Sequence, residues 1–371
     1  MPVLLLEKCN TIFLAQLLGG KIMRLFSILA CGCFSAILTV YGSIAYAAGK
    51  DIALPQAEPA AAGLTVGIML PASPDTYRQY TSVMTHKKRY HEGMFQFTMG
   101  DIDGVHVVLS SPPPIGSFSL TAIDTYLLER IFKPSIMIDP GTAGSHLPQL
   151  SMGDVVIGAR MVNFSNYMTK ENGAIVPGQF SALVADNEGY KIGNPNPEYI
   201  YADPVLVKLA ERAASECPDT PAEILLAPMG RKPWIMTYGT QGSGAAWLRN
   251  VQQIRQSTRI FHEADEAGNY PIALISTLNK VPFVEIHTIS DAAMNVPTKI
   301  NAYFHQCSVF AQLRSNKIAL QMIHYLAGQP YRKIPFSGGF RDPWQPDTFV
   351  KAVVPPAFVQ VWTKKYGVKR G

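Results

Sequence analysis

The sequence has few charged residues and few cysteines. Only 16% of its 371 residues are Asp, Glu, Lys or Arg, whereas 47% are hydrophobic, and a chain of this composition can bury a sizeable core. Of the five cysteines, only Cys217 and Cys307 follow residue 47, which excludes a small disulfide-built scaffold. The two could pair in an oxidising compartment, but their spacing gives no sign of it, so we expect free thiols.

Several functional motifs are also missing. No basic stripe with interleaved aromatic residues accompanies the net charge of +5, so nucleic-acid binding is not expected, and the short run Lys87–Arg89 is interpreted as a solvated face. The eight histidines are not spaced as metal ligands, and we expect neither a metal nor a cofactor. There is no Gly-x-Ser-x-Gly motif of a serine hydrolase. The loop Gly239–Gly244 lacks the Gly-Lys-Ser/Thr of a P-loop.

The first 47 residues have the pattern of a leader. Met23 and Arg24 precede a mostly apolar run, Leu25–Ile44, and a small-x-small sequence ends at Ala47. This is the order of regions in a signal peptide, so we expect cleavage after Ala47 and a periplasmic or secreted protein. An uncleaved N-terminal anchor and lipidation at Cys31 are the alternatives.

The rest of the chain alternates between apolar, β-branched runs and segments with helical periodicity. The expected strands are Leu64–Leu70, Val105–Ser110, Ser135–Asp139, Asp154–Val162, Glu223–Ala227, Trp234–Tyr238 and Val281–Ile289. The expected helices are Phe118–Phe132, Pro204–Ala214, Ala245–Arg255, Tyr270–Leu278 and Asn301–Leu326. This alternation predicts an α/β fold with a mostly parallel, buried sheet.

These elements predict one domain over residues 64–328. Residues 48–63 are rich in Ala and Pro and are expected to be a linker. The polar segment Leu183–Tyr201 is expected to be an inserted surface loop. Residues 329–371 are rich in Pro, Gly and aromatic residues, and this extension is expected to wrap the surface of the domain.

Two segments are candidates for a functional site. The strand Val281–Ile289 ends in Ser290 and Asp291, and the strand Ser135–Asp139 leads into a glycine-rich turn. Ligands of open α/β sheets bind where strand ends meet loops. A carboxylate there can exchange a proton with a substrate, and a glycine turn lets backbone N–H groups approach it. We therefore expect an enzyme that acts on a small polar molecule. The turn comprises Gly141, Thr142, Ala143 and Gly144.

A series of different short motifs follows along residues 64–328. They are Thr65–Met69, Leu127–Glu129 with Lys133-Pro134, Gly141–Gly144, Gly153–Val156, Val176–Gln179, Ala202–Pro204, and Val281–Phe283 running into Ile289–Asp291. Their order and spacing resemble the nucleoside phosphorylase superfamily, and within it the methylthioadenosine/S-adenosylhomocysteine nucleosidases and the related plant bark storage proteins. The resemblance implies a three-layer α/β/α sandwich with a mixed, partly barrel-like central sheet. It also implies a homo-oligomer that cleaves the N-glycosidic bond of a nucleoside.

The resemblance assigns roles to residues around the base. Asp291 matches the acid that protonates the purine N7, a role that requires a raised pKa. The alternative for Ser290 and Asp291 is that both are helix N-caps. Trp247 and Ser290 are expected to contact the base, although Ala245 stands where the family has an aspartate. A core tryptophan is the alternative for Trp247.

The resemblance also assigns carboxylates to the sugar and the attacking water. Glu266 matches the ribose-binding glutamate after a two-residue shift, whereas an ungapped count places Gly268 there, and the methionine of that motif is absent. Asp75 matches the glutamate that orients the water, but it is one methylene shorter. The alternatives are a solvated residue at a helix start for Glu266 and a turn residue for Asp75.

The loop after the second expected strand departs from the family. It contains Pro112–Pro114, whereas the family has Ser-Gly-Ile-Gly with N–H groups that face the nucleophile, and proline has no N–H group to donate. This favours water over phosphate as the nucleophile, or a loss of catalysis. We therefore expect a secreted purine nucleosidase whose partner is a small purine nucleoside. The alternatives are a phosphate-dependent nucleoside phosphorylase and an inactive nucleoside-binding or storage protein of the same fold.

Overall fold

The computed structural model describes most of the chain between residues 63 and 340. The described residues are 63–69, 74–111, 118–177, 185–186, 189–190, 197–217, 233–291, 304–327 and 334–340, and all lie in one unit, Ala57–Gly371. The expected signal peptide, all but Gly63 of the expected linker, the three prolines at 112–114 and the expected strand Glu223–Ala227 lie outside them. No helix among the described residues is long and apolar enough to span a membrane.

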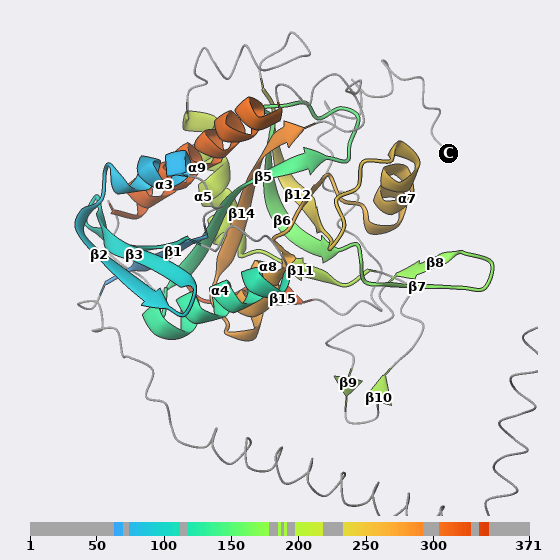
Figure 1. Cartoon of the computed structure of the whole chain (residues 1–371), viewed down its shortest axis with the longest axis horizontal. Helices are drawn as coiled ribbons and strands as arrows, with labels where there is room; N and C mark the ends of the chain where they lie inside the picture. The colour runs from blue at the N-terminus through green and yellow to red at the C-terminus, as the bar shows by residue number, and fades with distance from the viewer. Residues whose placement is uncertain are drawn as a thin grey trace, which may run out of the picture. The chain divides into compact units, whose positions relative to one another are not determined.

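A mixed sheet of 11 strands organises the domain (Figure 1). Its strands are β1 (Thr65–Met69), β2 (Thr85–Glu92), β3 (Phe95–Ile102), β4 (Val105–Ser111), β5 (Ile136–Ser145), β6 (Val155–Asn163), β11 (Tyr199–Tyr201), β12 (Ile235–Ser243), β13 (Asp265–Ala267), β14 (Phe283–Asp291) and β15 (Gly339–Phe340). Two short hairpins, β7 (Tyr167–Thr169) with β8 (Ile175–Pro177) and β9 (Ala185–Asp186) with β10 (Gly189–Tyr190), lie apart from it.

Five of these strands close into a small barrel. β5 pairs with β14 and β13, β6 pairs with β14 and β12, and β12 pairs with β13, so the ring β5–β14–β6–β12–β13 has no free edge. The ring contains both parallel and antiparallel pairs, and β2, β3 and β4 add an antiparallel meander beyond β1. The expectation of a mostly parallel sheet is therefore wrong, whereas the mixed, partly barrel-like sheet implied by the resemblance is confirmed.

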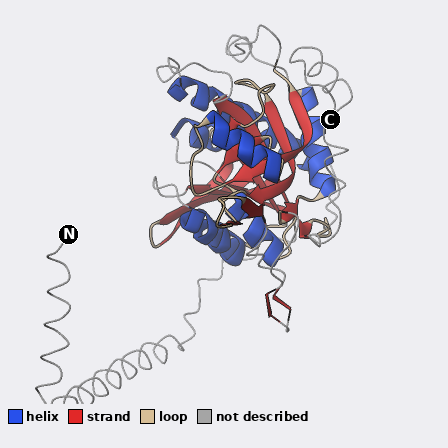
Figure 2. Ribbon diagram, turned by 90° about the vertical axis from the view of Figure 1, so that its right-hand side faces the viewer, coloured by secondary structure: helices blue, strands red, loops and turns tan. Residues whose placement is uncertain are grey.

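Helices cover the sheet on two sides (Figures 1 and 2). α4 (Phe118–Phe132) packs with α8 (Tyr270–Leu278) on one side, whereas α9 (Phe304–Ala327) packs with α3 (Pro74–Thr81) and α5 (Pro204–Glu216) on the other. α7 (Val251–Phe261) lies beside the barrel. The predicted bounds of α4 and α8 are confirmed, because apolar residues at helical spacing are buried in both, among them Leu128 and Ile272.

One side chain starts α5 and also holds the C-terminal segment. The Asp203 carboxylate accepts hydrogen bonds from the backbone N–H groups of Val205 and Leu206, at 2.9 and 3.4 Å, and so caps the helix. Pro204 follows at the first helical position, where a missing N–H group costs nothing. The Ser337 hydroxyl donates to the same carboxylate at 2.7 Å, which ties the described part of the C-terminal extension to the start of α5.

The structure corrects four predictions about local structure. Gly141–Gly144 is not a turn but the last part of β5, and residues 239–243 are not a loop but part of β12. Strand pairing satisfies the backbone groups of both segments, which composition alone cannot reveal. Tyr199–Tyr201, predicted as loop, forms β11. α7 starts at Val251 rather than Ala245 because the Asn250 side chain caps it, accepting from two backbone N–H groups.

Of the three meander strands, β4 was predicted, whereas β2 and β3 were not. β2 contains Lys87–Arg89 and is exposed along most of its length, so it has no apolar alternation to identify it. Among the described strands it pairs only with β3, at the edge of the sheet, and charged side chains are typical of edge strands because they discourage pairing with other chains. The prediction that Lys87–Arg89 is solvated is confirmed.

Candidate active site

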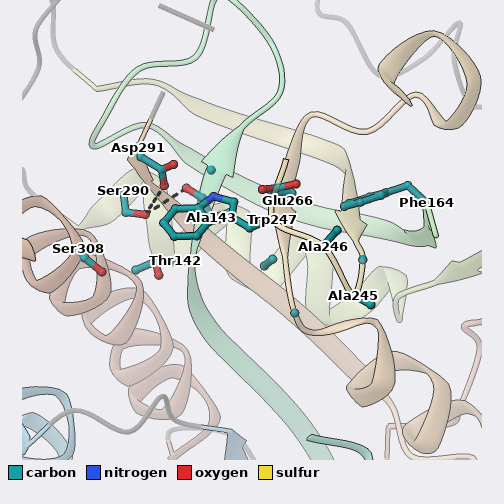
Figure 3. A pocket seen from close by; sticks show the side chains of 14 residues that line it. Thr142, Ala143, Phe164, Ala245, Ala246, Trp247, Glu266, Ser290, Asp291 and Ser308 are labelled. Carbon is teal, nitrogen blue, oxygen red and sulfur yellow. Dashed lines mark hydrogen bonds between the residues drawn. The ribbon is translucent and has the colours of Figure 1, made fainter. Parts of the chain in front are cut away.

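A cavity of about 330 Å³ opens beside the last residues of β5. This volume is at the lower end of the range for small-molecule sites, about 300–1,000 Å³. In the view of Figure 3, Ser290 and Asp291 lie toward one end of the cavity and Glu266 and Phe164 toward the other. The lining residues are Thr142, Ala143, Gly144, Phe164, Gly244, Ala245, Ala246, Trp247, Glu266, Ala267, Gly268, Ser290, Asp291 and Ser308.

Asp291 enters the cavity at an irregularity of β14. The strand runs in register with β5 as far as the pair Ile289–Ala143, and the next pair is Asp291–Gly144, so Ser290 is an extra residue. Such bulges redirect the side chains that follow them. Gly144 leaves the space that the carboxylate fills, because a Cβ atom there would lie 3.2 Å from Oδ2 of Asp291.

The environment of Asp291 favours its protonated form. Burial raises the pKa of this carboxyl, and the Ser290 hydrogen bond and the charges of Arg249 and His146 only partly oppose it. The Ser290 hydroxyl lies 3.0 Å from Oδ1 of Asp291 and 3.3 Å from the carbonyl oxygen of Ala143. A carboxylic acid in this state can donate a proton to a bound molecule.

Glu266 reaches the cavity from β13. Its carboxylate accepts hydrogen bonds from the backbone N–H of Leu248, at 2.9 and 3.1 Å from its two oxygens, and from Nε2 of His146 at 2.9 Å. Glu266 is only 6% exposed, so the alternative of a solvated residue at a helix start is wrong. A carboxylate has about four acceptor positions, and these contacts leave some of them for a ligand.

His146 joins Glu266 to a second buried carboxylate. Nδ1 of His146 donates to Oε1 of Glu263 at 2.9 Å, and both side chains are almost completely buried. Burial lowers the pKa of His146, but hydrogen bonds and charge attraction from Glu263 and Glu266 outweigh it and raise the pKa to about 9. The imidazole is therefore charged at neutral pH, and it fixes the position of Glu266.

The segment between β12 and α7 supplies an aromatic wall. The Trp247 side chain is 55% exposed, so the alternative of a core tryptophan is wrong. The Arg249 guanidinium lies 5.2 Å from the centre of its ring.

Gly268 lines the cavity at a position with room for a side chain, since a Cβ atom there would meet nothing within 4 Å.

The structure brings together most of the residues predicted from the sequence. Ser290, Asp291, Glu266, Trp247, Thr142, Ala143 and Gly144 all line the cavity. Gly141 does not line it and lies instead against His287. Asp75 is not among the lining residues either; it lies in the first turn of α3, exposed, with Oδ1 3.8 Å from a guanidinium nitrogen of Arg78.

Four contributing residues were missed by the sequence analysis. Phe164 and Ser308 line the cavity, and His146 and Glu263 support Glu266 from behind. The one available signal was a histidine two positions after Gly144, at the end of a candidate site segment. Nothing in the sequence pairs it with a glutamate 117 positions away.

Comparisons with known proteins agree with this fold. The model of the phosphorylase superfamily matches residues 66–324. The chain is 28% identical over 230 residues to a 5'-methylthioadenosine/S-adenosylhomocysteine nucleosidase of Geobacillus thermodenitrificans, covering 62% of this chain and 83% of that relative.

Two solved structures show the same fold. The 5'-methylthioadenosine/S-adenosylhomocysteine nucleosidase of Neisseria meningitidis, in complex with methylthio-immucillin-A, has a TM-score of 0.52 at 22% identity, over 70% of this chain and 99% of that one. The S-adenosylhomocysteine nucleosidase of Streptococcus pyogenes, in complex with 5-methylthiotubericidin, has a TM-score of 0.53 at 18% identity, over 72% of this chain and 98% of that one.

Proposed function

The chain belongs to the phosphorylase superfamily, and we propose that it is a nucleosidase that hydrolyses the N-glycosidic bond of a purine nucleoside. The observation that carries the proposal is the placing of an acid, Asp291, and a fixed carboxylate, Glu266, on one cavity of suitable size. The names of the curated relatives point to nucleosides with a sulfur substituent at C5', such as methylthioadenosine and S-adenosylhomocysteine.

Asp291 supplies the proton for the leaving base. As the bond between the purine and C1' breaks, negative charge develops on the base, and protonation at N7 neutralises it. The raised pKa of Asp291 keeps a larger fraction of this carboxyl protonated near neutral pH. The Ser290 hydroxyl holds the carboxyl in position, and Trp247 offers a flat apolar surface for the base.

Glu266 serves the sugar. Positive charge develops on the ribose ring as the bond breaks, and a nearby carboxylate stabilises it while accepting hydrogen bonds from ribose hydroxyls. His146 and the Leu248 N–H hold Glu266 in one orientation before substrate arrives, so little reorganisation is needed during the reaction.

Water is the proposed nucleophile. Phosphate sites in proteins depend on Arg or Lys side chains or on clustered N–H groups. Among the described residues that line the cavity there is no Arg or Lys, whereas there are two carboxyl groups. A lining without Arg or Lys offers no cationic side chain to a phosphate dianion, which favours water as the nucleophile.

A chromatographic assay tests the proposal. Purified protein is incubated with methylthioadenosine, S-adenosylhomocysteine, adenosine and inosine, each with and without phosphate. Free base that forms without phosphate, together with the free sugar, is the expected result. A requirement for phosphate, with ribose 1-phosphate as product, would show that the protein is a phosphorylase and not a nucleosidase.

A nucleoside-binding protein without turnover is the second candidate, and Gly268 is the observation that favours it. This glycine takes the place of the family's ribose-binding glutamate in the ungapped count. Its surroundings are open, so a glutamate side chain can be introduced there. If the natural chain binds nucleosides without cleaving them and Gly268→Glu cleaves them, the binding role is the correct one.

We also propose that residues 1–47 direct export of the chain. The basic start, apolar run and small-x-small sequence are the support for this. N-terminal sequencing of the mature protein from its native host tests it: a start at Ala48 is the expected result, and a retained leader in the cytoplasm would contradict it.

A further inference from the structure

A second group of ionisable side chains lies outside the cavity. Asp139 of β5 and Glu285 of β14 are register partners, and His287 follows two residues later. Thr288 points the opposite way, since its hydroxyl lies 2.8 Å from that of Ser315 in α9. Because side chains alternate along a strand, Glu285 and His287 share the face of β14 that is turned away from α9. All three ionisable side chains are buried.

The three side chains have the spacing of a metal site. One ligand atom from each can be chosen so that all lie within 4.8 Å of one another. Nε2 of His287 lies 3.5 Å from Oδ2 of Asp139. In a tetrahedral site with metal–ligand distances of about 2.0–2.2 Å, neighbouring ligand atoms lie about 3.4 Å apart.

His287 has the supporting contact that ligating histidines require. Its other nitrogen, Nδ1, lies 3.3 Å from Oδ2 of Asp265 in β13. In protein metal sites the second ring nitrogen of a histidine ligand is commonly held by a carboxylate, which fixes the tautomer and the ring orientation. Gly141 of β5 leaves room for the ring, since a Cβ atom there would lie 2.9 Å from Cδ2 of His287.

Asn269 adds an unsatisfied oxygen to the group. Its Nδ2 lies 2.7 Å from Nε2 of His287, 3.2 Å from Oδ2 of Asp139, and in contact with Oε2 of Glu285. An amide nitrogen has two hydrogens and cannot serve three acceptors. Oδ1 of Asn269 has no partner among the described residues, and neither has Oε1 of Glu285. Rotation of the amide by a half-turn turns Oδ1 toward the three ligands.

We propose that Asp139, Glu285, His287 and the amide oxygen of Asn269 bind one divalent transition-metal ion. Three oxygens and one imidazole nitrogen suit Zn²⁺ or Mn²⁺. Buried charges are normally paired or coordinated to a metal, and this cluster places the carboxylates of Asp139, Glu285 and Asp265 around a single imidazole. The ion would link β5 to β14, the same two strands that carry Gly144 and Asp291.

Metal binding by the full-length protein tests this site. Protein is stripped with EDTA, dialysed, and titrated calorimetrically with ZnCl₂ and with MnCl₂. We expect one ion per chain and a rise in melting temperature. Asp139→Asn and His287→Gln are expected to abolish binding, and Asp265→Asn to weaken it about 10–100-fold. Circular dichroism shows which variants are folded.

A matched control removes a different histidine cluster. Nδ1 atoms of His86 and His106 lie 2.9 and 3.2 Å from the Asp101 carboxylate on the meander. His86→Gln with His106→Gln is expected to leave binding unchanged, and loss of binding in this control would overturn the proposal.

Anomalous scattering at the zinc edge gives a measurement that needs no variant. A peak between Asp139 and His287 supports the site. Stripped natural protein that binds neither ion, a peak elsewhere, or folded Asp139→Asn and His287→Gln variants that bind like the natural chain would each overturn it.

Discussion

Glu266 and Asp291 are paired in register with the same residue, Gly144. Glu266 is its partner on β13 and Asp291 is its partner on β14. The two residues therefore lie on opposite sides of β5, near the end of that strand. A side chain at position 144 would crowd Oδ2 of Asp291. The lack of a side chain at Gly144 therefore lets both carboxyl groups line the same cavity.

Replacement of Asp291 by Asn is expected to remove the proton donor and keep the shape of the cavity. General acids contribute about 10²–10⁴-fold to the rate, so we expect kcat to fall by that factor with little change in KM. Release of free base, followed by chromatography, measures the effect. The control is Asp103→Asn, at an exposed position with a φ of 51° that asparagine tolerates. An unchanged rate in Asp291→Asn would contradict the acid role.

Asp75→Asn is expected to leave the rate unchanged. The side chain is exposed on α3 and is not among the residues that line the cavity, although the resemblance predicts that it orients the attacking water. Steady-state kinetics of this variant separates the two views. A loss of kcat comparable to that of Asp291→Asn would show that Asp75 takes part in the reaction.

His146→Gln is expected to destabilise the fold as well as the site. It removes the imidazolium from between Glu263 and Glu266, which are both buried. Removal of one partner from a buried ion pair typically costs about 3–5 kcal/mol, because the remaining charge has no compensation. Urea unfolding of the variant measures the loss. Adding Glu263→Gln should recover part of it, and no recovery would show that the charge of Glu263 is not the cause.

The stability of the protein is expected to fall as pH rises from about 6.5 to about 9. The pKa of His146 is about 9 in the folded state and 6.5 as an ordinary histidine, so the folded chain binds more protons in this interval. Its contribution is complete below pH 6.5 and is lost above 9. A shift of this size corresponds to on the order of 3 kcal/mol. Urea midpoints across the interval measure the slope, which should become shallower in His146→Gln.

Trp247→Ala is expected to weaken substrate binding without affecting the fold. More than half of the side chain is exposed, so its removal leaves no cavity in the core. Loss of one aromatic stacking contact is worth about 0.5–1.5 kcal/mol, which corresponds to an increase in KM of about 2–10-fold. Trp247→Phe should keep most of the affinity. Equal KM values for all three proteins would show that the base does not stack there.

Local features of the fold could be predicted because they depend on neighbouring residues. Apolar residues at helical spacing define α4 and α8, and β-branched runs locate β1, β4 and β14. The order of short motifs was enough to indicate the superfamily and to select Asp291 and Trp247. The ends of β5 and β12 were missed because they contain glycines, which have weak strand preference, so only pairing reveals them. β2 was missed because it is charged and exposed.

The sequence by itself therefore determined the α/β elements, the family resemblance and the choice of Asp291 as the candidate acid. Only the tertiary structure decided that Glu266 faces the cavity, that Asp75 does not line it, and that His146 joins Glu263 to Glu266. It alone placed Asp139 beside Glu285. The physical reason is that these positions depend on how segments far apart in the chain are paired. Glu266 and Asp291 reach the cavity through the register of β13 and β14 with β5, and a shift by one residue would turn every side chain of a strand to the opposite face.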